Sequence, residues 1–397
     1  MREALPPPAG NRWDYPVVTI AQFFLAFALN FMFVFLPFYV HTISSYDEPA
    51  TLRWTGLIVG AASAMATFGS NFWGHLTERF SPKAMFQRGV LSHAVLVALM
   101  GCTTDLRVLL GLRILQGFFG GISTIGLIII AVISREEQLA RRMGAYQSAL
   151  TLGQIFSPPL GAMAAAAFGF RGAFFASSVI LFGIFAFCWI GMSDLPPRNR
   201  VHRSDSLPRR QIWLAWLLSL IGTMHIVFLP SVLPNILTSF AVPADAQLVT
   251  AGTIVFLYGF SAAVGSYGFS RLASRLPPQR LVLSAALGAA GCQLLLIFGT
   301  TTLGFTLIRM LQTAFAAGIF PLVLAEIAAR SGGKTVGFIN TARFAGNALG
   351  PLVATFILSN ASLFSLYCVL AGVLAVTATG EYLGTRSCHV REEHGTA

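Results

Sequence analysis

Three arginines fall inside long apolar stretches of this chain, where a charged side chain is unusual: Arg113, Arg309 and Arg343. A guanidinium surrounded by hydrocarbon costs several kcal/mol unless it faces water or a partner. Each is therefore a candidate functional residue, although a structural role is an equal alternative for Arg309. No soluble catalytic domain fits between the stretches, so we expect charge recognition within a membrane and no enzymatic activity.

Polar side chains occur along the same stretches, at places where a transported molecule could lie. Two pairs of amides are 193 positions apart: Gln147 with Asn340, and Gln154 with Asn347. Amides in symmetric positions suit a cavity lining, with hydrogen bonds between helices as the alternative role. A lone histidine such as His225 is more often a hydrogen-bonded packing residue. The predicted cavity residues are Asn30, Gln147, Gln154, His225, Asn340, Arg343 and Asn347.

The elements that position these residues are predicted to be membrane-spanning helices. Of the 397 residues, 55% are hydrophobic and 10% are charged, against roughly 25% charged in a typical soluble domain. A helix needs about 20 apolar residues to cross a ~30 Å hydrocarbon core. Such stretches lie near 16–40, 55–73, 87–103, 106–133, 143–168, 172–192, 212–238, 247–268, 281–300, 303–328, 336–359 and 362–384. The predicted fold class is an all-α membrane protein with twelve transmembrane helices.

The chain contains a tandem duplication. Val34-Phe35-Leu36-Pro37 returns as Val227-Phe228-Leu229-Pro230, and Leu112-Arg113-Ile114-Leu115-Gln116 returns as Ile308-Arg309-Met310-Leu311-Gln312. The offsets of 193 and 196 residues predict two pseudo-symmetric six-helix bundles, with the substrate held between them. We place the bundles at 16–192 and 212–384, and between them a polar linker rich in proline and arginine at 193–211.

The net charge of +11 follows the membrane topology. Lys and Arg concentrate on the side that holds both termini and the linker, and outside the helices the opposite side has Arg53, Arg107 and Arg171. This asymmetry over short loops is the positive-inside rule. It predicts a multi-pass inner-membrane protein with cytoplasmic segments at 1–15 and 385–397, and no nucleic-acid binding. The first segment lacks an apolar core with a cleavage site, so we expect no removable signal peptide.

Several functional classes are excluded by missing patterns. The five cysteines are scattered without paired spacing, which excludes a disulfide framework and a thiolate metal cluster. No G-x4-G-K-[ST] loop is present to hold phosphates, which excludes an ATP-driven pump. We expect no cofactor and no metal. The expected partners are a small-molecule substrate, protons and membrane lipid, and the expected state is a monomer.

The loop after the second predicted helix contains a recognisable motif, Gly74-His75-Leu76-Thr77-Glu78-Arg79-Phe80-Ser81-Pro82-Lys83. It resembles the G-x-L-a-D-r-x-G-r-k signature of the major facilitator superfamily, with Glu78 in place of Asp. A carboxylate here can meet a helix N-terminus or a nearby Arg, so Glu78, Arg79 and Lys83 are candidates for a breakable latch. The alternative is a turn that merely obeys the positive-inside rule.

The fourth predicted helix carries Leu109-x3-Arg113-x2-Gln116-Gly117. This resembles the l-x3-R-x2-q-G motif of the same superfamily. The resemblance implies that Arg113 takes part in proton coupling.

The fifth helix carries Gly144-x8-Gly153-x3-Ser157-Pro158-x2-Gly161-Ala162, which resembles the G-x8-G-x3-G-P-x2-G-G signature of drug:proton antiporters. Small residues on one face permit close helix packing, and Pro158 adds a bend that can serve as a gate hinge. The second half keeps Gly350 and Pro351, which an inherited packing motif would also keep. We name Gly153, Pro158, Gly350 and Pro351 as gating candidates.

The acidic residues depart from that branch. Many of its exporters of lipophilic cations hold a carboxylate in the first or seventh helix, and this chain has none deep in either. Glu326 is the acid well inside a predicted span, and Arg330 four residues later favours a surface ion pair for it.

Together these features favour a secondary transporter that exports small amphipathic molecules in exchange for protons, by alternating access. An exporter or importer of an anionic metabolite or siderophore-like compound is the alternative within transporters. A substrate-sensing receptor or a lipid-handling protein on the same fold is the alternative from another class.

The proposed latch predicts an asymmetry between the two halves, because Ser274 stands where the first half has Glu78. Glu78→Ala should leave the protein folded but strongly reduce transport, since one conformational state loses its tether. Ser274→Ala should be nearly silent. Transport assays of both variants at equal expression test this, and equal effects at the two positions would contradict an asymmetric latch.

Overall fold

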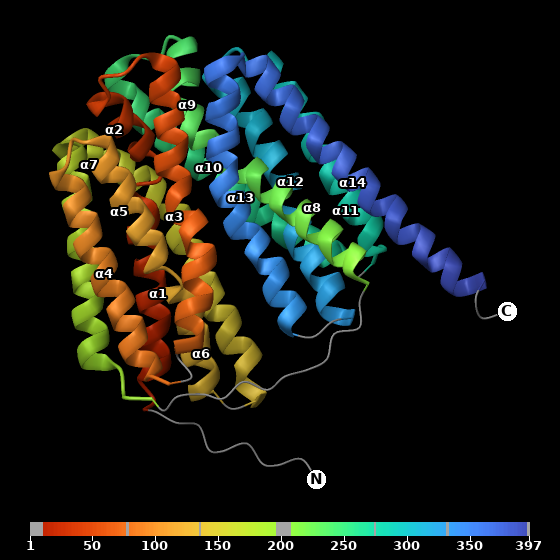
Figure 1. Cartoon of the computed structure of the whole chain (residues 1–397), viewed down its shortest axis with the longest axis horizontal. Helices are drawn as coiled ribbons and strands as arrows, with labels where there is room; N and C mark the ends of the chain where they lie inside the picture. Colours follow the sequence, from red (N-terminus) through yellow and green to blue (C-terminus); the bar gives the residue numbers. More distant parts are fainter. Residues whose placement is uncertain are drawn as a thin grey trace. The chain divides into compact units, whose positions relative to one another are not determined.

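The computed structural model describes residues 11–76, 79–134, 136–195, 208–273, 275–330 and 333–394. Every element within these ranges is a helix (Figure 1). The first half contains α1 (Asp14–Phe31), α2 (Phe35–Ile43), α3 (Glu48–Leu76), α4 (Pro82–Cys102), α5 (Leu106–Phe118), α6 (Ile122–Ile133) and α7 (Glu136–Gly191). The second half contains α8 (Arg209–Val227), α9 (Leu229–Ser239), α10 (Ala244–Leu272), α11 (Pro278–Leu295), the 3-10 helix η1 (Leu296–Phe298), α12 (Thr302–Arg330), α13 (Gly333–Asn360) and α14 (Leu363–His394).

The helices fit the twelve predicted spans. In the described part of the chain, 9 helical stretches are long and apolar enough to cross a membrane. One of these, Arg141–Gly191, has 51 residues, enough for two crossings. It is broken at Gly169, whose φ of 70° lies in the left-handed region that favours glycine. Helices α3 and α13, of 29 and 28 residues, are also long enough to span. The protein is therefore a multi-pass, all-α membrane protein.

Two helix breaks follow directly from a repeated sequence. Residues 32–34 separate α1 from α2, and Phe228 separates α8 from α9. Both breaks lie at the copies of Val-Phe-Leu-Pro. Pro37 and Pro230 have no N–H, so the carbonyls of Phe33 and Ile226, four residues earlier, lose their helical donor.

A third break occurs in the first half alone. Helix α5 ends at Phe118, and α6 begins at Ile122 after Gly121, whose φ is 85°. The corresponding residues of the second half are Ala316 and Ala317, and α12 continues through them without interruption. Alanine is the best helix former, whereas adjacent glycines weaken a helix and permit the left-handed turn. The substitution of the glycines thus accounts for the difference between the halves.

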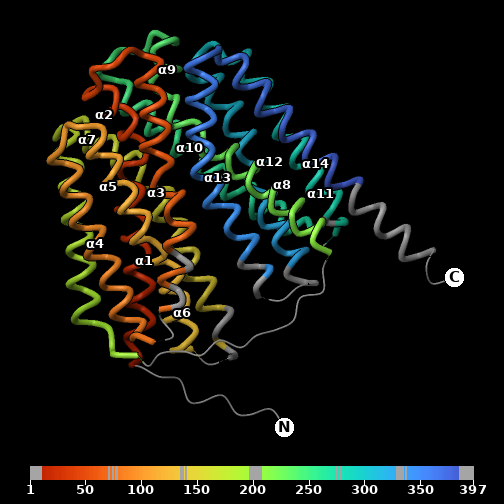
Figure 2. The backbone as a smooth tube through the Cα atoms, in the orientation of Figure 1, coloured from red at the N-terminus to blue at the C-terminus, as the bar shows by residue number. Residues whose placement is uncertain are grey.

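The chain forms two compact units, residues 1–39 with 65–200 and residues 40–64 with 201–397. In the first unit α1 and α4 each pack along α7. In the second unit α8 packs along α13, and α11 along α14. Figure 2 traces the path of the backbone from the first helix to the last. Helix pairs that correspond in the sequence repeat therefore make corresponding contacts.

Residues 40–64 belong to the second unit although they lie early in the sequence. Asn235 Nδ2 donates a hydrogen bond to Glu48 Oε1 at 2.6 Å, and His41 Nδ1 lies 3.9 Å from Glu48 Oε2. At Gly60, an added Cβ would lie 2.5 Å from the carbonyl oxygen of Ala348. The first part of α3 thus packs directly on the backbone of α13.

Glycines of the repeated motif in α7 and α13 allow two further close approaches. A Cβ at Gly153 would lie 2.9 Å from Phe27 N in α1. A Cβ at its repeat partner Gly346 would lie 2.6 Å from Leu220 O in α8. The expected packing of this small-residue face on a neighbouring helix is present in both units.

This contact predicts that Gly153→Val impairs folding or transport, because the added side chain meets the backbone of α1. Gly183→Val is a control in the second span of α7, beyond the break at Gly169, since a Cβ at Gly183 meets nothing within 4 Å. We expect a destabilisation of about 1–3 kcal/mol for Gly153→Val and a much smaller effect for Gly183→Val. Thermal unfolding and transport of the two purified variants check this. Equal stability of both variants would show that α7 can move away from α1 at no cost.

Candidate functional site

The first unit holds Arg113 as a half-buried charge on α5. Its Nη1 donates to Gln116 Oε1 at 2.5 Å, one turn along the same helix, and lies 3.8 Å from Met32 Sδ in the segment between α1 and α2. The break at Gly121 follows closely. Arg113 therefore lies where two broken helices meet, a kind of place that membrane proteins use for ion and substrate sites.

The second unit repeats this arrangement with different neighbours. Arg309 Nη1 donates to Gln312 Oε1 at 2.6 Å, and its Nη2 donates to Ile226 O at 2.9 Å. Ile226 carries the carbonyl that Pro230 deprives of its helical donor. The conserved spacing of Arg and Gln in the repeat thus produces the same hydrogen bond in both halves.

Arg309 differs from Arg113 in its exposure. Its side chain is 0% exposed, and its guanidinium carbon lies 4.7 Å from the ring centroid of Phe228 and 4.8 Å from that of Tyr258. The hydrogen bond from Arg309 Nη2 also satisfies the carbonyl of Ile226, which has no helical donor at the helix break. This is a structural role. The sequence motif alone could not show this difference in burial.

Arg343 is the most exposed of the three arginines. It projects from α13, and its guanidinium carbon lies 4.9 Å from the ring centroid of Phe320 on α12. Its repeat partner is Leu150, so this charge exists in one unit only.

The predicted cavity amides have different surroundings. Gln147 and Gln154 are exposed on α7, whereas Asn340 and Asn347 are half-buried on α13. The half-buried Asn30 donates to Ala26 O at 2.8 Å within its own helix. The two exposed glutamines are thus the most available of this set.

His225 is buried in the packed interior of the second unit, with 0% exposure. Its Nδ1 lies 2.9 Å from Ile221 O, one turn earlier in α8. The ring is therefore packed inside the unit and contacts the backbone of its own helix.

The latch candidates are described in part. Arg79 is exposed, and Lys83 Nζ donates to Met192 O at the end of α7, 2.5 Å away. Glu78 and its counterpart Ser274 lie outside the described residues. The gating candidates Gly153, Pro158, Gly350 and Pro351 are all buried.

Glu326 and Glu381 both lie within spanning helices of the second half. Glu326 is half-buried and accepts from Gln279 Nε2 at 3.3 Å. Glu381, which the sequence analysis did not single out, is 9% exposed within α14.

The first unit contains a buried polar network formed by side chains of α1, α6 and α7. Tyr146 Oη lies 2.5 Å from Gln22 Oε1 and 3.0 Å from Ser123 O, and Gln22 Nε2 donates to Ser123 Oγ at 2.9 Å. The three positions correspond in the second half to Ala215, Ile319 and Ile339. All three positions are polar in the first half and apolar in the second. This shared difference between the halves is the sequence signal that identifies the network.

Comparisons with known proteins agree with these features. Residues 18–305 match the family description Major Facilitator Superfamily. Multidrug resistance protein MdtG of Yersinia enterocolitica is 23% identical over 381 residues, covering 92% of this chain and 91% of the relative. MdtG of Dickeya zeae is 25% identical over 393 residues, covering 95% of each. The crystal structure of the human organic anion transporter MFSD10 (TETRAN) has a TM-score of 0.67 at 16% identity, covering 93% of this chain and 98% of that chain.

The duplicated helices, the paired Arg-x2-Gln bonds and a family match over most of the chain lead to one conclusion. The protein is a member of the Major Facilitator Superfamily.

Proposed function

We propose that this protein exports small amphipathic molecules across the inner membrane in exchange for protons, with both termini in the cytoplasm. As a member of the superfamily it is a secondary transporter and not an enzyme. Two relatives that cover almost the whole chain are named multidrug resistance proteins, which supports efflux. The resemblance of the α7 motif to the antiporter signature supports exchange against protons.

The observation that carries the proposal is the partial burial of the charged Arg113 side chain inside a span. The side chain is held to Gln116 beside breaks in α5 and between α1 and α2. A charged side chain inside a membrane span marks an ion or substrate pathway. We assign Arg113 the coupling role, and Gly153 with Pro158, and Gly350 with Pro351, the role of hinges in the two units.

A specific observation favours anions among the amphipathic substrates. Arg343 is an exposed charge within a span, and the sequence repeat does not require it. A cation at a low-dielectric wall raises the local concentration of anions. The related structure MFSD10 is titled an organic anion transporter. An anionic metabolite or siderophore-like compound is therefore the second candidate substrate class.

Proteoliposomes with an imposed pH gradient test the proposal directly. The purified protein should accumulate a fluorescent amphipathic probe in the acidic lumen, and addition of the probe should release protons that a pH dye detects. A protonophore should abolish both signals. Transport that persists without a proton gradient and moves no protons would contradict exchange against protons.

Arg113→Ala should reduce transport of every substrate by more than about tenfold. Without proton coupling the protein has no driving force for export, whichever substrate it binds. Arg107→Ala is the matched control, since Arg107 is an exposed arginine at the start of the same helix. The rates are measured in the same vesicles at equal protein content. Substrate-dependent effects of Arg113→Ala would instead assign it to substrate recognition.

Arg343→Leu should change charge preference without stopping transport. Removing one cation from the cavity wall should lower the anion-to-cation transport ratio by about tenfold, equivalent to ~1.4 kcal/mol. Competition between an anionic and a cationic probe of similar size measures the ratio, with Arg53→Leu at an exposed position as control. If the unmodified protein already prefers lipophilic cations and Arg343→Leu leaves that preference unchanged, the anion argument fails.

A further inference from the structure

Helix α6 is short and is separated from the rest of its predicted span. It has 12 residues, and Gly121, the residue before it, provides no side-chain cap. Helices shorter than about 12–15 residues are marginal on their own, and lipid offers no partner to unpaired backbone groups. Contacts with neighbouring helices must therefore hold α6 in place.

The first turn of α6 is held by side chains of α1 and α7. Tyr146 Oη donates to Gln22 Oε1 at 2.5 Å and lies 3.0 Å from Ser123 O, and Gln22 Nε2 donates to Ser123 Oγ at 2.9 Å. Tyr146 and Gln22 are each 0% exposed. A Cβ at Gly126, one turn further along α6, would overlap the Tyr146 hydroxyl. The Tyr146 side chain therefore extends from α7, lies against α6 and ends at α1.

The last turn of α6 is held by the same two neighbours. Arg142 Nη1 donates to Ile133 O at 3.0 Å and to Ser134 Oγ at 3.4 Å, which satisfies a carbonyl at the helix end. Its guanidinium carbon lies 4.8 Å from the ring centroid of Tyr15 on α1. Arg142 and Tyr146 are one turn apart on α7 and share a face of it. Helix α6 is thus fastened at both ends by four residues, which we call the clamp: Tyr15, Gln22, Arg142 and Tyr146.

The second half differs in both the clamp and the helix break. At the positions of the clamp it has Pro208, Ala215, Thr335 and Ile339. Helix α12 runs without interruption through Ala316 and Ala317, which replace Gly120 and Gly121. The clamp and the break therefore occur together, as expected if the clamp provides the hold that a continuous helix would provide by itself.

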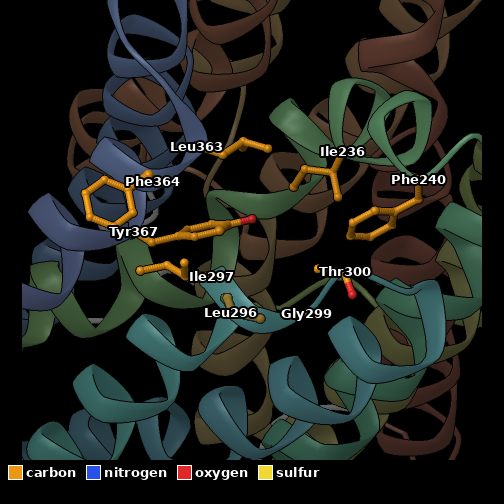
Figure 3. Close-up of a pocket in the computed structure, with 9 residues that line it drawn as sticks. All are labelled: Ile236, Phe240, Leu296, Ile297, Gly299, Thr300, Leu363, Phe364 and Tyr367. Atoms are coloured by element: carbon orange, nitrogen blue, oxygen red, sulfur yellow. The ribbon is translucent and has the colours of Figure 1, made fainter.

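A cavity beside α12 does not account for this difference. The second unit has a pocket of about 200 Å³ between the end of α9, η1 with the turn that follows, and the start of α14 (Figure 3). None of the described residues that line it belongs to α12. The difference between α6 and α12 therefore lies in the residues of the two halves.

We propose that Arg142 and Tyr146 are positioning residues, which clamp α6 to α1 and α7 so that the three helices move as one body during transport. A change of angle within the fourth predicted span is then confined to Gly120 and Gly121, at the end of the helix that carries Arg113. This role rests on the proposed function, because it concerns a step of transport. The hold on α6 is measured without transport, so failure of the export proposal and failure of the clamp give different results.

Amide hydrogen exchange of the full chain in phosphatidylcholine nanodiscs measures the hold on α6. Peptides that cover residues 122–133 report its opening, with residues 82–102 of α4 as the internal reference. Tyr146→Phe removes one hydroxyl and keeps the ring, so it should fold normally and speed exchange of α6 about fivefold, as the loss of one hydrogen bond predicts. Arg142→Gln should have the same effect on the last turn.

Two matched controls should leave the exchange of α6 unchanged. Tyr267→Phe makes the same chemical change on α10, at a side chain that is 68% exposed. Arg141→Gln removes an exposed arginine next to Arg142. Faster exchange of α6 in either control would show that the effect does not come from the clamp.

Transport kinetics in proteoliposomes separate positioning from substrate binding. Tyr146→Phe should lower the maximum rate of export of the fluorescent probe about fivefold and leave KM unchanged, because the hydroxyl contacts α1 and α6. A raised KM with an unchanged maximum rate would place Tyr146 at the substrate and overturn its positioning role. Absence of export by the unmodified protein would overturn the proposed function, and the exchange results would still decide whether the clamp holds α6.

The second half supplies matched replacements for a further variant. Gln22→Ala, Ser123→Ile and Tyr146→Ile together introduce its residues and should speed exchange of α6 by about tenfold or more. Adding Gly120→Ala and Gly121→Ala should join α5 and α6 into one helix and return exchange to within about twofold of the unmodified protein. Export should remain below about one-tenth of normal, because the span has lost its break.

Two further results would overturn the proposal. Unchanged exchange of α6 in both Tyr146→Phe and the triple variant would show that apolar packing alone, such as that of Ile122 on Gly89 of α4, holds the helix. Full export by the variant with all five substitutions would show that transport needs neither the clamp nor the break. If the triple variant does not fold, Tyr146→Phe decides the matter.

Discussion

A backbone carbonyl that loses its helical hydrogen bond inside a membrane must find a donor within the protein, because lipid provides none. The chain meets this constraint with side chains at its helix breaks. Pro230 leaves Ile226 O without its helical donor, and Arg309 donates to it. At the end of α5, Trp73 Nε1 donates to Phe118 O at 2.7 Å. The helix breaks and the polar residues near them therefore depend on one another.

This dependence explains how one duplicated motif acquired two environments. In both units an Arg reaches a Gln one turn away. In the first unit Gly121 ends the helix beyond this pair, whereas in the second Ala317 lets it continue. Arg309, in the continuous helix, is enclosed by aromatic rings. Arg113, in the helix that ends early, remains half-buried.

The fold could largely be predicted from the sequence because the bilayer imposes length and polarity on each helix. The repeat also indicated which helices correspond, and the glycine motif indicated the close packing at Gly153. Burial was harder to predict, since it depends on neighbours distant in the sequence. Arg309 and Arg113 carry the same motif with different exposure, and the burial of Glu381 in α14 could not be read from its place near the end of an apolar stretch.

Helix α3 has a mechanical consequence. It is one helix of 29 residues, and its first part belongs to the second unit while its last part, from Met65, belongs to the first. Residues 61–67 read AASAMAT, a stretch dominated by the strongest helix former and without Gly or Pro to serve as a joint. A helix with such a stretch at its middle resists bending. Bending α3 between its two parts would have to break helical hydrogen bonds, because the stretch offers no residue at which a helix kinks easily.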